Sequence, residues 1–131
     1  MDILDRINAR KREEVAEAVQ RMPVAALERS PFFSRPVRSI SRAVRESVKH
    51  GIIAEFKRSS PSAGAIRQSA RPQEIIPAYV NAGAAAISVL TDSDFFGGSA
   101  GDLCVARGLT EIPILRKDFI ISEYQIGRAH V

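Results

Sequence analysis

A short apolar run that carries one acid and one base constrains this chain more than any other feature. Residues 52–66 read Ile-Ile-Ala-Glu-Phe-Lys-Arg-Ser-Ser-Pro-Ser-Ala-Gly-Ala-Ile. Side chains of a β-strand alternate between its two faces, so Glu55 and Lys57 point one way and Phe56 the other. A strand that buries one face and presents an ion pair just before a turn is typical of strands that deliver catalytic groups. A surface strand with a solvated Glu and Lys is the alternative on this segment alone.

A second apolar run ends in the same way. Residues 112–119 read Ile-Pro-Ile-Leu-Arg-Lys-Asp-Phe, and alternation places Lys117 on one face between Leu115 and Phe119. Apolar neighbours on both sides favour burial of the lysine stem. We therefore expect Lys117 to meet the Glu-Lys pair of the first strand at the carboxyl ends of adjacent parallel strands, on the same side of the sheet.

Helical patterns alternate with the strands. Residues 84–91 form a third apolar run without a charged residue, as expected for a strand of a parallel sheet that is covered on both sides. Start signals, stop signals and apolar spacing predict helices over residues 73–82 and from Ser99 toward Gly108. The order strand, helix, strand, helix, strand predicts the α/β class with parallel strands and right-handed crossovers.

The first 50 residues differ in kind from the rest. Residues 2–22 form a charged amphipathic segment that predicts a helix ended by Pro23, and Ser39 is a candidate cap for another helix that runs to His50. Acidic residues lie among the basic ones and no apolar h-region is present, so the segment reads as neither a secretion signal nor a transit peptide. We expect helices packed on the outside of one domain, not a separate domain.

Composition narrows the function classes. The chain has 131 residues, of which 45% are hydrophobic and 26% charged, and this is ordinary for one soluble domain. No apolar stretch approaches membrane-spanning length, so no membrane partner is expected. Cys104 is the one cysteine, which fits a reducing cytoplasm, and it is expected to pack in a helix core. His50 and His130 have no suitably spaced partners, so no metal is expected.

The net charge of +4 suits an anionic ligand, and surface helices rich in Arg explain it equally well. Basic residues are interspersed with acidic ones and no pattern of basic and aromatic residues is seen, which speaks against nucleic acid as a partner.

Two loops directly follow predicted strands, which is the position of active-site loops in folds with parallel strands. Residues 59–64 come directly after the Glu-Lys strand, and their hydroxyl and N–H groups could bind a phosphate or hydroxyl; a flexible linker is the alternative. Residues 95–99, Phe-Phe-Gly-Gly-Ser, place two aromatic side chains in a polar loop, where one of them could cover an apolar ligand; a simple turn is the alternative. The second loop lacks the Gly-Lys-Ser/Thr ending of a Walker loop.

Several motifs together resemble the indole-3-glycerol-phosphate synthase family of (β/α)8-barrel enzymes, over residues 1 to about 126. In order, they are Ile-Leu-Asp-Arg-Ile with Lys-Arg-Glu-Glu-Val, Ile-Ile-Ala-Glu-Phe-Lys-Arg-Ser-Ser-Pro-Ser, Ser-Val-Leu-Thr-Asp with Phe-Phe-Gly-Gly-Ser, and Leu-Arg-Lys-Asp-Phe-Ile with Tyr-Gln-Ile. The resemblance implies an α/β fold that is a partial (β/α)8 TIM barrel. An N-terminal helical extension over residues 1–50 would precede the first three βα units over residues 51–126.

The resemblance also implies a reaction and a set of site residues. It implies a carboxy-lyase that closes the pyrrole ring of indole in tryptophan biosynthesis, with no organic cofactor and no metal. Lys117 matches the family's general acid, Lys57 matches the lysine that contacts the anionic groups of the substrate, and Glu55 is the orienting partner of Lys57. The residues implied in substrate binding are Ser60, Phe96 and Phe119.

The implied partner is a phosphorylated small molecule, and the full-length form is either monomeric or fused to another domain of the tryptophan pathway. Two other function classes stay open. One is a different phosphosugar enzyme of the barrel fold, such as phosphoribosylanthranilate isomerase, which should lack the combination of Glu-x-Lys and Lys-Asp-Phe. The other is a non-catalytic module that binds a partner.

The chain departs from the family in its length and its ending. A (β/α)8 barrel has eight strands and typically about 250 residues, so a fragment with three strands is expected to be inactive by itself. Gly127 is a poor residue within a helix, so the family's helix is expected to stop before it. One choice of codons for residues 126–131 spells ATCGGAAGAGCACACGTC, which is similar to the start of a common sequencing adapter. We therefore expect residues 127–131 to be an artefactual tail; a genuine frameshift or an early stop is the alternative.

Overall fold

The computed structural model describes residues 1–130. The chain forms two compact units. Unit 1 consists of residues 1–36 and the segment that begins at residue 119, and unit 2 consists of residues 37–118.

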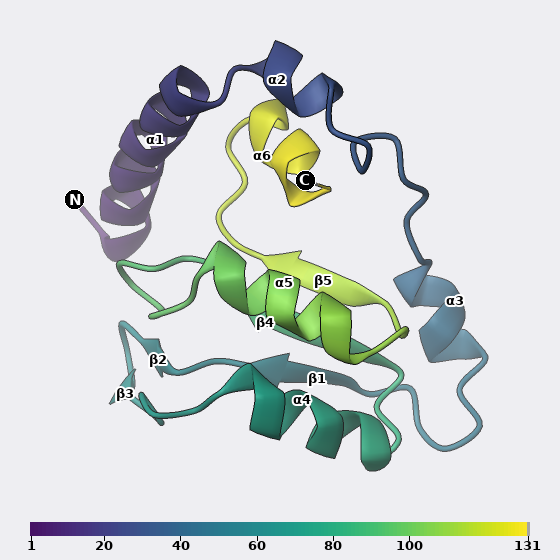
Figure 1. The fold of residues 1–131 in the computed structure, drawn as a ribbon. Helices are drawn as coiled ribbons and strands as arrows, with labels where there is room; N and C mark the ends of the chain where they lie inside the picture. The colour runs from purple at the N-terminus through teal and green to yellow at the C-terminus, as the bar shows by residue number, and fades with distance from the viewer. Residues whose placement is uncertain (131) are drawn as a thin grey trace. The chain divides into compact units, whose positions relative to one another are not determined.

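A parallel three-stranded sheet is the centre of unit 2 (Figure 1). Its strands are β1 (Ile53–Phe56), β4 (Ala86–Leu90) and β5 (Ile114–Lys117), in the spatial order β1-β4-β5. All three apolar runs are thus confirmed as strands, and the predicted α/β class with parallel pairing is confirmed. The strand with no charged residue is the central one, where both edges pair with a neighbour.

Two helices cover one face of this sheet, α4 (Pro72–Asn81) and α5 (Ala100–Leu109) (Figure 1). Alternation directs every second side chain of each strand toward them. The buried residues of this core are Phe56, Ala70, Ile76, Ile87, Val89 and Ala106. Glu55, Ser88 and Lys117 alternate with these core positions and therefore occupy the opposite face.

The predicted helix boundaries follow from local signals. Pro72 is the first residue of α4, where its missing N–H costs nothing, and Gly83 follows the helix with a φ of 93° that suits glycine. Ser99 caps α5, because its side chain accepts a hydrogen bond of 3.1 Å from the N–H of Asp102. The expectation that Cys104 packs in the core is wrong: it is exposed, because α5 turns Asp102 and Ala106 inward.

Two features of unit 2 differ from the sequence prediction. Helix α3 (Ile40–Arg45) begins after the Ser39 cap as expected but ends well before His50. The hydroxyl of Ser47 donates to the carbonyl of His50 (2.6 Å) and thus offers the backbone a turn in place of the helix. The loop after β1 also contains a small antiparallel hairpin, formed by β2 (Ser59–Ser60) and β3 (Gly64–Ala65).

Unit 1 is helical and contains α1 (Ile3–Arg21), α2 (Val24–Glu28) and α6 (Glu123–Ala129). The predicted first helix is confirmed, with Asp2 as its cap. The short helix α2 after Pro23 was not predicted. The hydroxyl of Tyr124 lies 3.0 Å from the carbonyl oxygen of Ala18 and 2.6 Å from that of Met22, so α6 is tied to the end of α1.

The expectation that Gly127 ends the last helix is wrong. Helix α6 continues through Gly127 to Ala129, since Ser122 and Gln125 form a capping box that satisfies its first N–H groups. A β-carbon on Gly127 would lie 3.1 Å from the ring of Phe33, so the small residue suits close packing inside the unit. The artefactual origin of residues 127–131 stays a prediction, and residue 131 lies outside the described residues.

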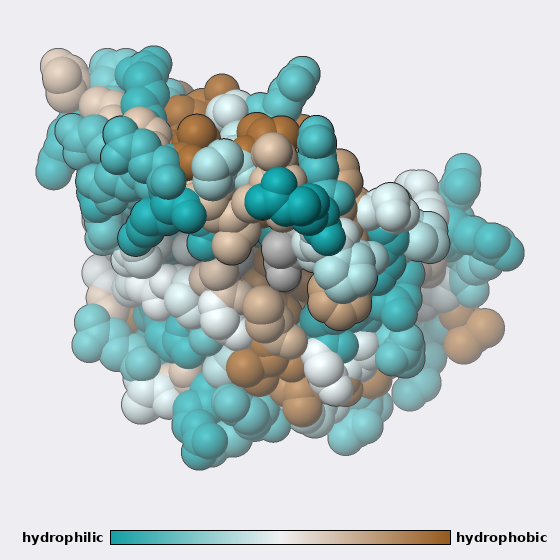
Figure 2. Space-filling model, turned by 45° about the horizontal axis from the view of Figure 1, so that its top comes forward, coloured by the Kyte–Doolittle hydropathy of each residue, from teal (hydrophilic) through white to brown (hydrophobic). Residues whose placement is uncertain are grey.

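Apolar side chains also reach the surface, and Figure 2 shows brown areas between the teal ones. In unit 2 the exposed large apolar residues are Val37, Val48, Ile52, Ile53, Ile66, Leu109 and Leu115. Within residues 1–130, no helix combines the length and the apolar character that crossing a bilayer requires.

Candidate active site

Three charged side chains meet on the face of the sheet that α4 and α5 leave uncovered. The ammonium of Lys117 lies 2.8 Å from Oε2 of Glu55, and the ammonium of Lys57 lies 3.6 Å from Oε1 of the same carboxylate. The register explains this meeting, because Glu55 pairs with Ser88 and Lys117 pairs with Leu90, one pleat further along. The expectation that both lysines lie on one side of the sheet is confirmed. The expectation that their strands are adjacent is wrong, because β4 lies between β1 and β5 and pairs with both.

Ser88 of the central strand completes this cluster. Its hydroxyl donates a hydrogen bond of 3.1 Å to Oε2 of Glu55, the oxygen that also accepts from Lys117. The sequence reasoning did not single out Ser88. The available signal was a single hydroxyl within an otherwise apolar strand, on the same alternation as the charged residues of the other two strands.

The cluster holds the carboxylate of Glu55 in its ionised form. Burial by itself raises the pKa of Glu55, but the hydrogen bond and charge of Lys117, the hydrogen bond of Ser88 and the charge of Lys57 together outweigh it and lower the pKa below its ordinary value. The side chains of Glu55, Lys57 and Lys117 are 28%, 34% and 53% exposed. The two ammonium groups therefore stay within reach of a ligand.

Ser60 lies in the hairpin that follows β1. Its side chain is buried, and its hydroxyl accepts a hydrogen bond of 3.1 Å from the N–H of Ala63. This bond rigidifies the turn between β2 and β3. Because β1 and β4 are parallel, the loops that follow them leave the sheet at the same edge.

Phe96 lies in the loop that follows β4. Asp92 organises this loop: its carboxylate accepts from the N–H of Phe95 (2.9 Å) and its carbonyl accepts from the N–H of Gly98 (2.8 Å). Gly98 has to be glycine, because a β-carbon there would collide with the carbonyl oxygen of Leu90. The loop that contains Phe96 is thus pressed against the carboxyl end of β4.

The sequence reasoning also missed an ion pair between Arg58 and Asp102. The guanidinium of Arg58 binds both carboxylate oxygens of Asp102 in α5. Arg58 follows the Glu-Lys strand directly, but the side chain that would partner it lies 44 residues away, so the local pattern carried no signal for this pair.

Phe119 belongs to unit 1, whereas the other five predicted site residues belong to unit 2. Its carbonyl accepts a hydrogen bond of 2.9 Å from the side chain of Gln125. Its part in the site stays a prediction.

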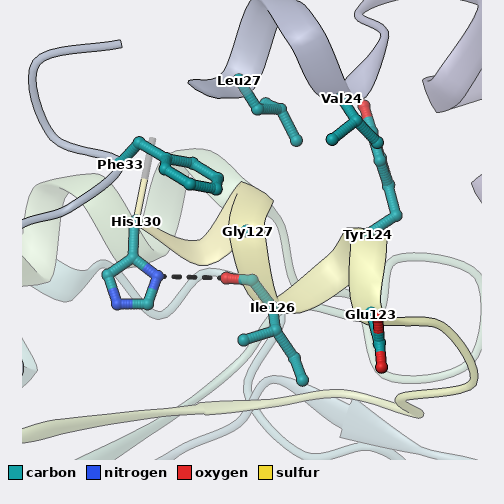
Figure 3. Close-up of a pocket in the computed structure, with 8 residues that line it drawn as sticks. All are labelled: Val24, Leu27, Phe33, Glu123, Tyr124, Ile126, Gly127 and His130. Atoms are coloured by element: carbon teal, nitrogen blue, oxygen red, sulfur yellow. Dashed lines mark hydrogen bonds between the residues drawn. The ribbon is translucent and has the colours of Figure 1, made fainter. Parts of the chain in front are cut away.

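Unit 1 has a pocket of its own, with a volume of about 490 Å³ (Figure 3). Leu27 and Phe33 face Tyr124 and Gly127 across it, and His130 Nδ1 lies 3.1 Å from the carbonyl oxygen of Ile126 at its side. None of the predicted site residues lines this pocket. Its walls are mostly apolar, and Glu123 and His130 are the acidic and the basic residue among those that line it.

No group of three or more His, Cys, Asp or Glu side chains within residues 1–130 is placed to hold a metal ion. The chemistry that the cluster on the sheet can perform is proton transfer and the binding of anions, since it presents two ammonium groups beside one carboxylate.

Comparison with known proteins gives one consistent family. The family model described as indole-3-glycerol phosphate synthase matches residues 4–131. An indole-3-glycerol phosphate synthase from Bacteroides thetaiotaomicron is 51% identical over 130 residues, which cover 99% of this chain and 50% of that protein. Proteins of the same name from Laribacter hongkongensis and Bordetella pertussis are 42% and 46% identical, over 98% and 95% of this chain and 50% and 49% of their own lengths.

The chain thus spans about half the length of the curated relatives it matches. The matched region includes the strand with Glu55 and Lys57 and the strand with Lys117. On the extent of the family match and the identity to these relatives, the chain belongs to the indole-3-glycerol phosphate synthase family.

Proposed function

We propose that this chain is the N-terminal half of an indole-3-glycerol phosphate synthase. It supplies the helical extension and the first three βα units of a (β/α)8 barrel, and the other half supplies the remaining strands. Support comes from the family match, from coverage of half of each relative, and from three parallel strands with helices on one face. In such a barrel the uncovered face becomes the inner wall, and the carboxyl ends of its strands carry the chemistry.

The substrate of the complete enzyme is 1-(2-carboxyphenylamino)-1-deoxyribulose 5-phosphate, and the products are indole-3-glycerol phosphate, carbon dioxide and water. The ring carbon that bears the carboxylate attacks the ketone carbon, and a carbon–carbon bond forms. The carboxylate then leaves as carbon dioxide and restores the aromatic ring. The former ketone oxygen leaves as water as the pyrrole ring is completed.

The single observation that carries this proposal is the contact of 2.8 Å between Lys117 and Glu55 beside the second ammonium, that of Lys57. Attack on the ketone builds negative charge on its oxygen, and a positioned acid lowers the barrier by giving that oxygen a proton. Lys117 is the general acid in this step. Glu55 aims the ammonium of Lys117, and Lys57 binds the anionic groups of the substrate.

The two loops and Phe119 complete substrate binding. Ser60 provides a hydroxyl beside the strand that carries Lys57, and Phe96 and Phe119 enclose the aromatic ring of the substrate. Aromatic side chains suit this part, because ring-to-ring packing adds about 0.5–1.5 kcal/mol to the gain from burying the surface.

The test is ring closure by a full-length enzyme that contains these residues. The purified protein is given the carboxyphenylamino-ribulose phosphate, and the formation of indole-3-glycerol phosphate and of carbon dioxide is followed together. We expect both products in equal amounts. Phosphoribosylanthranilate serves as the counter-substrate: its isomerisation, without ring closure, would assign the protein to the other phosphosugar chemistry and contradict the proposal.

A further inference from the structure

Thr91, the first residue after β4, binds three consecutive residues at the carboxyl end of β5. Its N–H donates to the carbonyl of Lys117 (3.0 Å). Its hydroxyl donates to Oδ2 of Asp118 (2.7 Å) and accepts from Nε of Arg116 (3.2 Å). One threonine thus holds the proposed general acid by its backbone and also holds both of its neighbours in the chain.

Strand alternation explains how one residue reaches all three. The register pairs Leu90 with Lys117, and the side chains of both lie on the uncovered face of the sheet. The side chain of the next residue, Thr91, therefore points to the opposite face, as do those of Arg116 and Asp118. The threonine holds the end of β5 from the helix-covered face, and this leaves the ammonium of Lys117 on the uncovered one.

The contacts of the Thr91 hydroxyl are shielded from water. Thr91 is 8% exposed, and the side chains of Arg116 and Asp118 are 19% and 3% exposed. The guanidinium of Arg116 also lies 3.6 Å from the carboxylate of Asp118, so the hydroxyl bridges two opposite charges that already face each other. A hydroxyl can donate to the anion and accept from the cation at the same time, whereas the valine side chain has the same shape and can do neither.

The side chain of Lys117 depends on a fixed backbone because it is long and 53% exposed. Its ammonium is carried on a flexible four-carbon stem, so a shift of the Lys117 backbone moves the ammonium away from Glu55. A general acid acts only when its proton lies within reach of the reacting oxygen, and a misplacement of about 1 Å can cost about 10²-fold in rate. The contacts of Thr91 fix this part of the backbone.

We propose that Thr91 is a positioning residue for the general acid: its hydroxyl fixes the backbone on both sides of Lys117 and so aims the ammonium at the ketone oxygen of the substrate. This inference rests on the proposed function. Thr91 acts through the strand that it holds, and the anionic groups of the substrate are assigned to Lys57. Loss of the hydroxyl should therefore lower kcat and leave KM nearly unchanged.

The test compares Thr91→Val, Thr91→Ser and Thr110→Val in a full-length enzyme that contains these residues. Thr110 is a matched control, because it is also buried and its hydroxyl accepts from the N–H of Ile112 (3.3 Å), at the amino end of β5. We expect Thr91→Val to lower kcat by about tenfold and to leave KM within about twofold of the parent value. Thr91→Ser keeps the hydroxyl and should stay within about threefold of the parent kcat. Thr110→Val should keep the parent kcat.

Two kinetic outcomes would overturn the proposal. One is a Thr91→Val enzyme whose kcat stays within about twofold of the parent value. The other is a Thr91→Ser enzyme that is impaired as much as Thr91→Val, because the packing of the methyl group, and not the hydroxyl, would then be what matters. If Thr91→Val does not fold, Thr91→Ala replaces it, since the alanine and serine variants differ at this position by the hydroxyl alone.

The pKa of Glu55 tests the same inference without activity. Burial raises this pKa, and the hydrogen bond and charge of Lys117 lower it, so a displaced ammonium should let it rise. Carbon NMR of the labelled side chain should find a higher pKa in Thr91→Val than in the parent and in Thr110→Val, a difference that a general loss of stability does not produce. An equal pKa of Glu55 in Thr91→Val and the parent would sink the inference even in an enzyme that closes the ring. A parent enzyme that does not close the ring would instead contradict the proposed function, and the pKa comparison would still decide the role of Thr91.

Discussion

The ammonium of Lys117 lies 2.8 Å from the carboxylate of Glu55, although 62 residues separate them in the chain. The two residues belong to the edge strands β5 and β1, and the central strand β4 lies between them. Their side chains meet above Ser88, whose hydroxyl donates to the same carboxylate oxygen. A parallel sheet in register thus brings the carboxylate of Glu55 to the ammonium of Lys117, and Lys57, directly after β1, adds a second ammonium to the cluster.

Lys117→Ala should damage the chemical step. In a full-length enzyme we expect kcat to fall by about 10²–10⁴-fold with a much smaller change in substrate affinity, because a general acid acts mainly in the transition state. Single-turnover measurements at saturating substrate separate the two quantities. Arg42→Ala is the control, because Arg42 forms an exposed pair with Glu46 on α3, and it should keep parent turnover. A Lys117→Ala enzyme with near-normal turnover and weakened affinity would reassign Lys117 to binding.

The carboxyl group of Glu55 should titrate below the ordinary value of a glutamate. Carbon NMR of the labelled side chain measures this pKa directly. In Lys117→Ala the pKa should rise, because the hydrogen bond and charge that lower it are lost while burial, which raises it, persists. An unchanged pKa of Glu55 in Lys117→Ala would show that Lys117 does not stabilise the ionised carboxylate in solution.

The same shift predicts a dependence of stability on pH. Because the folded pKa of Glu55 is lowered, its ionised form stabilises the fold above the unfolded pKa, and this contribution is lost as pH falls through the folded pKa. The difference in unfolding free energy between the parent and Glu55→Gln should therefore shrink on acidification through that range. Glu46→Gln, at an exposed pair, is the control. An equal difference at neutral and acidic pH would contradict the prediction.

Gly98→Ala should destabilise the protein. The added β-carbon would collide with the carbonyl oxygen of Leu90 and lie 2.7 Å from its carbonyl carbon, so the backbone of the loop has to shift. We expect a loss of about 1–3 kcal/mol in the unfolding free energy, measured by chemical denaturation. Gly108→Ala is the matched control: its β-carbon meets open space within α5, and we expect a gain of about 0.5–1 kcal/mol. If Gly98→Ala and Gly108→Ala changed the unfolding free energy by similar amounts, the contact between residue 98 and the carbonyl of Leu90 would not be what requires glycine there.

The chain of 131 residues by itself should associate and show no ring closure. Ile53 and Leu115 on the uncovered face are each 44% exposed, and β1 and β5 are the edge strands of the described sheet. Apolar edge strands favour pairing between chains. Light scattering and binding of a hydrophobic dye report on this. A soluble monomer with sharp, cooperative thermal unfolding would instead favour an independent binding module.

Local sequence patterns predicted much of the fold. The period-two alternation around Glu55 and Lys57 and around Lys117 predicted both the strands and the shared face, because strand side chains alternate wherever the strand lies. The caps at Ser39 and Ser99 were equally local, since a cap involves residues only three apart. Leu90 shows the limit of such patterns: alternation places it on the uncovered face with Ser88, yet it is buried, because β4 is flanked by strands on both sides.

The remaining features depend on contacts between distant parts of the chain. The early end of α3 and the short hairpin after β1 are exceptions, because they follow from bonds between residues only a few positions apart that outweigh weak local preferences. The hydrogen bond of Ser88 to Glu55 and the binding of Arg58 to Asp102 span 33 and 44 residues. Sequence periodicity assigns a side chain to a face but not to a partner, because the partner is chosen by strand order and register. Spacing along the chain thus identified Glu55, Lys57 and Lys117, whereas the packing of the sheet and its two helices determined which groups hold these side chains in place.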